Sequence, residues 1–202
     1  SRPWTNDILP RLKEQALQPS VVAIGEIGLD YYRQHTPHDQ QKIMFSTQLR
    51  LAAEVNLPVV IHNRDSTDDL LSILQDWHQE LVNKDHPLSN RPGVLHSFTG
   101  DLAFAKAALA MNFFIGINGP ITFKNAQNRR LVTKMLPLDC LLLETDAPFL
   151  TPHPYRGKRN EPAYIPLIAA EIAHLHNTST QQIAEITYTN ALKLFNFHKI
   201  PK

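Results

Sequence analysis

The sequence predicts an α/β protein of the (β/α)8 TIM-barrel type, with about the first three β/α units absent from this chain. Short apolar runs alternate with amphipathic segments, which is typical of parallel strands joined by helices. Four of these runs lead into an acidic or histidine side chain: Glu26, His62, His96 and Asp146. From Glu26 to His62 is 36 residues and from His62 to His96 is 34, the spacing of repeated units. A closed barrel needs about 250 residues, more than the 202 present.

Five strands are expected, at residues 21–25, 58–62, 93–96, 113–118 and 140–145. Helices are expected at residues 6–17, after Thr36, at 70–81, 103–111, 125–135, 161–174 and from 179 to Phe195. Thr36 is expected as an N-cap with Pro37 in the first turn, and Ser66 begins a second capping sequence. Residues 83–92 are polar and predict a surface loop. No linker divides the chain, so residues 1–202 are expected to form a single, partial barrel domain.

The composition narrows the function classes. The net charge is +1, from 20 basic and 19 acidic residues, which excludes a protein that coats nucleic acid through overall charge. A nucleic-acid substrate would have to be held locally. Cys140 is the only cysteine and lies in an apolar run, so we expect a buried, inert thiol and a reducing compartment. No run is long enough to span a bilayer and no signal peptide opens the chain, so we expect a cytoplasmic protein without membrane contact.

The four residues that follow the strands are candidate metal ligands. Carboxylates suit hard divalent cations, and imidazole suits zinc, manganese or nickel. Glu26, His62, His96 and Asp146 could hold one ion or part of a two-ion site. Two ions about 3.5–4 Å apart can activate a water and stabilise both oxygens of a phosphodiester displacement. Glu26 is the candidate for the bridging carboxylate. A single carboxylate after a strand is more often a helix cap or an ion-pair partner. Two carboxylates and two histidines that follow successive strands in this order favour a metal site.

Neighbouring residues suggest how a substrate is bound. Arg64 could bind a phosphate or carboxylate, with an ion pair to Asp65 or Asp30 as the alternative. Glu144 could hold a basic residue of the barrel, or orient a histidine ligand. The loop that follows Asp146 carries the aromatic and basic residues Phe149, Tyr155, Arg156, Lys158 and Arg159. This mixture suits phosphates and stacked bases of a single strand, with an ordinary solvated loop as the alternative.

Five motifs together resemble one family, the TatD family of metal-dependent deoxyribonucleases, which are amidohydrolase-like TIM barrels. The motifs are Gly25–Tyr32, His62–Asp65, His96–Gly100, Leu143–Pro148 and Arg156–Pro162. The resemblance extends from residue 3 to residue 195. It implies two divalent ions (Mg²⁺, Mn²⁺ or Zn²⁺) and hydrolysis of DNA, as single strands or at 3′ ends, by a 3′–5′ exonuclease.

The resemblance also implies roles for individual residues. Glu26 would bridge the two ions, His62 and His96 would complete one site, and Asp146 would belong to the other and orient the attacking water. Glu26 and Asp146 are therefore the expected catalytic residues, and Arg64, Tyr155, Arg156 and Arg159 the expected substrate-binding residues.

The chain departs from the family pattern in one respect. The family's first strand ends in a His-x-His pair that ligates the first ion, and no such pair is present. One metal site is therefore expected to be incomplete, and the activity of the 202 residues is in question. Two alternatives stay open: another amidohydrolase-like ester or amide hydrolysis, in which lysine often bridges the metals, or an inactive, truncated barrel.

Overall fold

A computed structural model describes residues 8–33 and 36–197 of the chain. These residues divide into two compact units, which are described in turn. The first contains residues 1–94, 111–113 and 193–202, and the second contains residues 95–110 and 114–192. The expectation of a single domain stays a prediction.

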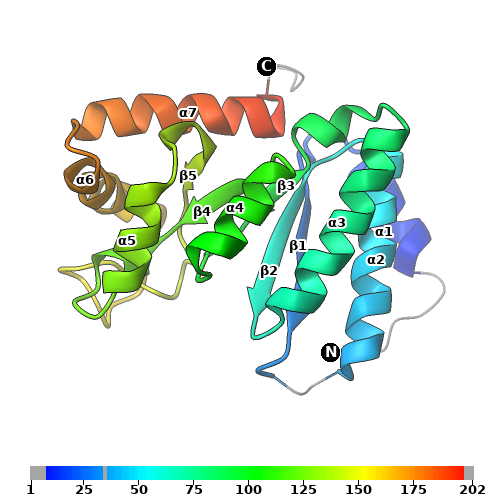
Figure 1. Cartoon of the computed structure of the whole chain (residues 1–202), viewed down its shortest axis with the longest axis horizontal. Helices are drawn as coiled ribbons and strands as arrows, with labels where there is room; N and C mark the ends of the chain where they lie inside the picture. The colour runs from blue at the N-terminus through cyan, green and yellow to red at the C-terminus, as the bar shows by residue number, and fades with distance from the viewer. Residues whose placement is uncertain (1–7, 34–35, 198–202) are drawn as a thin grey trace. The chain divides into compact units, whose positions relative to one another are not determined.

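The first unit is a layer of parallel strands with helices packed on it (Figure 1). Its elements are α1 (Ile8–Ala16), β1 (Ile24–Asp30), α2 (His38–Val55), β2 (Val59–Arg64), α3 (Thr67–Asn83), the 3-10 helix η1 (Pro87–Asn90) and the start of β3 (Gly93–Leu95). The strand order is β1-β2-β3, and β1 pairs with β2 in parallel, with Gly28 opposite His62. Alternate apolar side chains of these strands are fully or nearly fully buried, at Ile27, Leu29, Val59 and Ile61. The period of two therefore orients one face of β1 and β2 into the core.

Strand β1 corrects the sequence prediction. It begins at Ile24 and runs on to Asp30, whereas residues 21–25 were expected. The strand continues through Gly28, which allows a close backbone approach between the two strands. Gly28 has φ +138°, and a Cβ there would lie 2.0 Å from the His62 carbonyl oxygen. Glu26 therefore lies within β1 rather than beyond its end.

Two helix starts also differ from the sequence prediction. Helix α2 begins at His38 with Pro37, not Thr36, at the N-cap position. Ser66 is the N-cap residue of α3 as expected, but its side chain makes no capping bond. Its Oγ lies instead 3.0 Å from the Leu29 oxygen and 2.7 Å from Asn63 Oδ1, so it ties β1 to the end of β2. The predicted loop at residues 83–92 contains the short helix η1. For α1, the expected first residues Asn6 and Asp7 lie outside the described residues.

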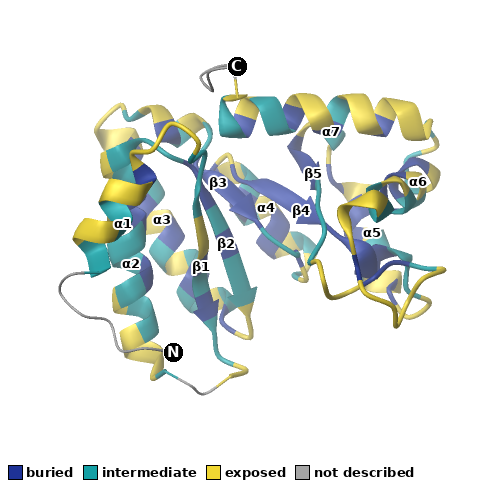
Figure 2. Cartoon of the chain, turned by 180° about the vertical axis from the view of Figure 1, so that it is seen from behind, coloured by how far each residue is buried: buried dark blue, intermediate teal, exposed yellow. Residues whose placement is uncertain are grey.

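The second unit repeats the alternation of strand and helix. It contains the last residue of β3, then α4 (Leu102–Ala110), β4 (Phe114–Ile117), η2 (Gly119–Thr122), α5 (Gln127–Met135), η3 (Leu138–Cys140), β5 (Leu141–Leu143), η4 (Pro162–Tyr164), α6 (Ile165–Leu175) and most of α7 (Thr180–Phe195). β4 pairs with β5 in parallel, with Gly116 opposite Leu142. β4 is buried along its whole length, whereas much of α7 is exposed (Figure 2).

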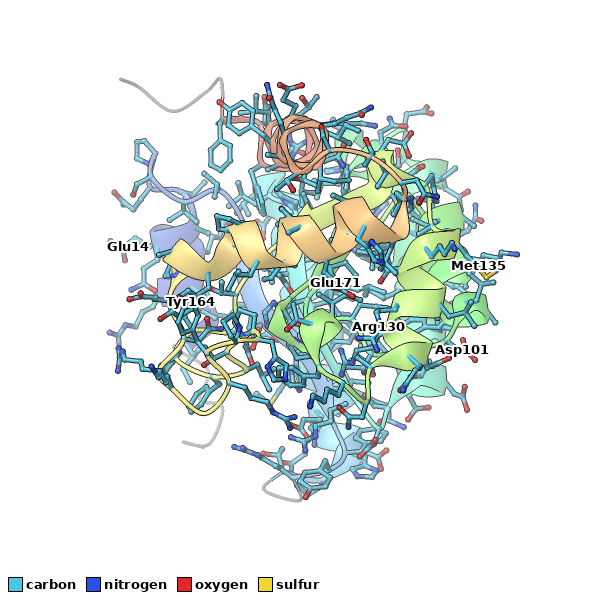
Figure 3. All side chains as sticks on the ribbon, turned by 90° about the vertical axis from the view of Figure 1, so that its left-hand side faces the viewer. Glu14, Asp101, Arg130, Met135, Tyr164 and Glu171 are labelled. Carbon is cyan, nitrogen blue, oxygen red and sulfur yellow. The ribbon has the colours of Figure 1, made fainter. Side chains whose placement is uncertain are left out.

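Polar contacts tie the helices of the second unit together. Arg130 of α5 reaches Glu171 of α6, with 3.8 Å between Nε and Oε1 (Figure 3). The buried Asn190 of α7 donates to two main-chain oxygens, in η3 and β5, at 2.9 and 2.8 Å. Cys140 is buried as expected, and burial, followed by the charge of Asp139, raises the pKa of its thiol to about 12. Within the described residues, no helix combines the length and apolarity that a membrane crossing requires.

Candidate metal centre

In the first unit, the candidate ligands Glu26 and His62 lie on the neighbouring strands β1 and β2. Glu26 lines a hollow of about 320 Å³ that is bounded by β1 and α2. Asp30, Gln41 and Gln48 line the same hollow. Two carboxylates therefore line one hollow, together with Arg33 and with Gln41, whose amide is bound to the main chain of Asp30 and Thr36.

His62 faces Asp30. The distance between His62 Nε2 and Asp30 Oδ2 is 3.4 Å. This Nε2 atom is buried and makes no hydrogen bond with any described residue, so the 3.4 Å contact lacks hydrogen-bond geometry. The close approach of Gly28 to the His62 backbone fixes the two strands at this point. The imidazole nitrogen is thus positioned beside a carboxylate oxygen and has an unused electron pair or proton.

Asp30 is held as a carboxylate. Partial burial raises its pKa, but the Arg33 N–H bond to Oδ1 and the nearby His62 and Arg64 outweigh burial, so the pKa lies below its ordinary value. The Arg33 N–H donates to Oδ1 at 3.0 Å. Both main-chain groups of Asp30 bond to the side chain of Gln41, at 2.9 and 3.0 Å.

In the second unit, His96 and Asp146 lie together. His96 Nε2 is 3.2 Å from Asp146 Oδ1, and His96 Nδ1 is 2.8 Å from Glu144 Oε2. When Nδ1–H donates to Glu144, the Nε2 electron pair points to the Asp146 carboxylate. Two electron-pair donors at this distance are stabilised by a cation between them, either a proton or a metal ion. Of the alternatives for Glu144, the structure shows the one in which it orients a histidine.

Three further residues support Glu144, directly or through Ser97, by contacts that the sequence did not predict. The Ser97 N–H donates to Glu144 Oε1, and the buried Asn118 donates to Ser97 Oγ at 2.7 Å. Gly116 of β4 leaves the space that the carboxylate fills, because a Cβ there would lie 2.7 Å from Glu144 Cδ. A glycine inside a strand was the available signal, since it marks a close approach by another group.

The distances within both pairs match those between two ligands of one ion. Ligand atoms 2.0–2.2 Å from a metal lie about 3.0–3.6 Å apart in octahedral to tetrahedral geometry. His62–Asp30 at 3.4 Å and His96–Asp146 at 3.2 Å both fit. Within residues 8–33 and 36–197, no group of three or more His, Cys, Asp or Glu side chains is placed to hold a metal ion. The pairs therefore supply two ligands each, and the common site of Glu26, His62, His96 and Asp146 stays a prediction.

The expected substrate residue Arg64 stacks on an aromatic ring. Its guanidinium carbon lies 3.8 Å from the centre of the Tyr32 ring, and Tyr32 is 63% exposed. Sequence reasoning weighed a phosphate contact against an ion pair and did not predict this stacking. Stacking fixes the guanidinium plane and leaves its N–H groups for a planar anionic partner.

The loop after Asp146 forms a cluster of aromatic and basic side chains within the second unit. Tyr155 stacks on Tyr164, with 4.7 Å between ring centres and an interplanar angle of 18°. Arg156 lies 4.3 Å above the Phe123 ring, and Lys158 lies 5.6 Å from the Tyr155 ring. Arg159, also expected to bind substrate, is exposed. We call these side chains, with the exposed Phe149, the loop cluster.

The backbone beneath the loop cluster is fixed by buried polar groups. Asn160, only 2% exposed, donates through Nδ2 to the Phe149 oxygen at 2.6 Å, and the Thr151 hydroxyl donates to the Lys158 oxygen. No Asp or Glu occurs between residues 147 and 160. The loop therefore presents aromatic and positively charged groups from a tied backbone, without a carboxylate of its own.

Comparison with known proteins identifies the family. The family model described as "TatD related DNase" matches residues 1–196. The chain belongs to this family. It is 46% identical to the "Uncharacterized metal-dependent hydrolase YabD" of Bacillus subtilis over 96% of the chain and 72% of the relative. It is 38% identical to the "3'-5' ssDNA/RNA exonuclease TatD" of Erwinia tasmaniensis over 96% of the chain and 73% of that relative.

Solved structures confirm the expected fold class. The TatD homologue YJJV of Escherichia coli matches with a TM-score of 0.85 and 32% identity, over 96% of the chain and 71% of that structure. A hydrolase TatD family protein of Entamoeba histolytica matches with a TM-score of 0.76 and 26% identity, over 94% of the chain and 67% of that structure. The protein is thus a metal-dependent hydrolase of this family, acting on ester bonds, with a TIM-barrel-type α/β fold.

Proposed function

We propose that the protein hydrolyses phosphodiester bonds of single-stranded DNA from the 3′ end, with divalent metal ions. The observation that carries this substrate class is the loop cluster. It combines stacked aromatic rings with Arg156, Lys158 and Arg159, and the neighbouring carboxylate of Glu161 lies against Tyr164. Such a surface suits a single strand, because each base offers a face for stacking and each phosphate offers a negative charge.

The proposed roles follow from the geometry in each unit. Divalent ions, when bound, would activate water and stabilise the charge that develops on the phosphate. Glu144 holds His96 Nδ1 and Asp146 lies at 3.2 Å from His96 Nε2; we propose that Nε2 and the Asp146 carboxylate would hold a divalent ion. We propose that Asp146, which is more exposed than Glu144, would accept a proton from the attacking water.

The first unit would supply the remaining groups. We propose that Glu26 bridges two ions, Mg²⁺, Mn²⁺ or Zn²⁺, and that His62 completes one site. Arg64, held over Tyr32, would bind a phosphate oxygen in the fixed plane of its guanidinium. The name of the Erwinia relative supports both the 3′–5′ direction and a single-stranded substrate.

The test uses a single-stranded DNA oligonucleotide with a 5′ fluorophore. Incubation with Mg²⁺, Mn²⁺ or Zn²⁺ should shorten it stepwise from the 3′ end, and EDTA should abolish the reaction. A matched oligonucleotide with a 3′ phosphate and a blunt duplex serve as controls for end and strand preference. Hydrolysis of simple carboxylic esters by a protein that leaves every oligonucleotide intact would refute the proposal and favour the other amidohydrolase-like reaction.

A further inference from the structure

Asp30 ends β1 with its main chain and its side chain both held in place. Gln41 accepts from the Asp30 N–H at 2.9 Å and donates to the Asp30 oxygen at 3.0 Å. Gln41 also donates to the Thr36 oxygen at 3.0 Å, so the clamp joins β1, the following loop and α2. The Arg33 N–H occupies carboxylate oxygen Oδ1. Asp30 thus presents Oδ2 in one orientation, and the ordering of its side chain is already complete before any ligand arrives.

The atom that Oδ2 faces is a buried imidazole nitrogen. His62 Nε2 lies 3.4 Å away, without the geometry of a good hydrogen bond, and His62 contributes to the lowered pKa of Asp30. A bound ion or water is among the few explanations for a buried polar atom that is paired so loosely. The Gly28 contact keeps the two strands from moving apart, so the arrangement belongs to the fold.

We propose that Asp30 Oδ2 and His62 Nε2 bind the same divalent cation, which makes Asp30 a metal ligand in addition to the expected four. This inference rests on the metal dependence that the proposed function requires. The 3.4 Å separation lies within the about 3.0–3.6 Å expected for two ligands of one ion.

The experiment compares metal affinity between two matched acid-to-amide variants by isothermal titration of the full chain with MnCl2. Asp30→Asn removes the charge of the proposed ligand and keeps an oxygen for the Arg33 N–H. Asp65→Asn removes a charge from the exposed turn after β2, three residues beyond His62. Asp30→Asn should raise the Kd for Mn²⁺ at least about 10-fold, and Asp65→Asn should leave it within about 2-fold.

Further measurements separate a ligand from a structural residue. The metal-free Tm of Asp30→Asn should match that of wild type; if it falls, Asp30→Ser provides a second removal of the charge. His62→Gln should raise the Kd for Mn²⁺. Adding Asp30→Asn to His62→Gln should raise the Kd by a smaller factor than Asp30→Asn does in wild type, because both side chains bind the same ion. Equal affinities of Asp30→Asn and Asp65→Asn, or a wild-type chain that binds no Mn²⁺, would overturn the inference.

Failure of this inference can be told from failure of the proposed function. A wild-type chain that binds Mn²⁺ in an Asp30-dependent manner but cleaves no oligonucleotide would refute the nuclease and leave Asp30 as a ligand. If wild type cleaves DNA and Asp30→Asn binds Mn²⁺ as tightly as wild type, the nuclease proposal stands and Asp30 is not a metal ligand.

Discussion

Gly116→Ala should disturb the candidate metal centre without touching a ligand. The added Cβ would lie 2.7 Å from both Cδ and Oε1 of Glu144. Ordinary contacts of this kind begin at about 3.4 Å, so the carboxylate has to move by about 0.7 Å or more. The bond from His96 Nδ1 to Glu144 Oε2, now 2.8 Å, would then lengthen beyond the range of a good hydrogen bond.

The expected loss in the free energy of unfolding follows from the hydrogen bonds that Glu144 makes. A hydrogen bond to a charged, largely buried group contributes about 1.5–3 kcal/mol, and Glu144 also accepts the Ser97 N–H. We expect Gly116→Ala to lower the free energy of unfolding by about 1–3 kcal/mol, or the Tm by about 2–4 °C for each kcal/mol. Because His96 loses its orientation, the affinity for Mn²⁺ should fall about 10- to 100-fold.

The assay is thermal unfolding without metal together with isothermal titration with MnCl2. The control is the double variant Gly116→Ala/Glu144→Asp, in which the shorter acid leaves room for the Cβ. It should recover part of the stability and affinity that Gly116→Ala loses. If Gly116→Ala unfolds and binds Mn²⁺ as wild type does, Glu144 does not orient His96 through this contact, and the reasoning fails.

Three further outcomes are expected. Burial, with the hydrogen bond and charge of Asp69, raises the pKa of Tyr31 from 10.0 to about 12. The stability that protonated Tyr31 contributes should be complete below pH 10 and be lost towards pH 12. The free energies of unfolding of wild type and Tyr31→Phe, measured by urea unfolding, should therefore converge as the pH rises. Tyr155→Ala should weaken binding of single-stranded DNA about 5- to 150-fold in fluorescence anisotropy, whereas Tyr188→Ala, at an exposed ring of α7, should not. Asn190→Ala should cost about 1–3 kcal/mol in chemical unfolding, since two main-chain oxygens lose their donor, and an unchanged midpoint would refute that role.

Periodicity predicted the elements of this fold well, because burial imposes the same pattern wherever a strand or helix faces a core. All five expected strands are present, and their helices follow in the expected order. The boundaries of β1 were wrong because local sequence does not show what lies across the sheet. The strand was expected to end at residue 25, yet it continues past Gly28, which lets the His62 backbone approach.

The candidate site was predictable in its residue types and not in its supports. His96 and Asp146 are 50 residues apart in sequence, and each follows a strand of the parallel sheet, so the parallel arrangement brings them together. Gly116 and Asn118 act through packing and a chain of hydrogen bonds from another strand and its loop. Such tertiary contacts leave no periodic signal in the sequence.

Each unit places a histidine nitrogen close to a carboxylate oxygen. In the first unit, His62 Nε2 on β2 lies 3.4 Å from Asp30 at the end of β1. In the second unit, His96 Nε2 lies 3.2 Å from Asp146, which follows β5. A glycine leaves the space that each arrangement needs. Gly28 allows the His62 backbone to approach β1, and Gly116 allows the Glu144 carboxylate, which orients His96, to approach β4. Each contact places an imidazole nitrogen beside a carboxylate oxygen, where a proton or a metal ion between them would be stabilised. The glycines are therefore as necessary to the proposed metal chemistry as the ligands, because a side chain at either position would displace a ligand or the residue that orients it.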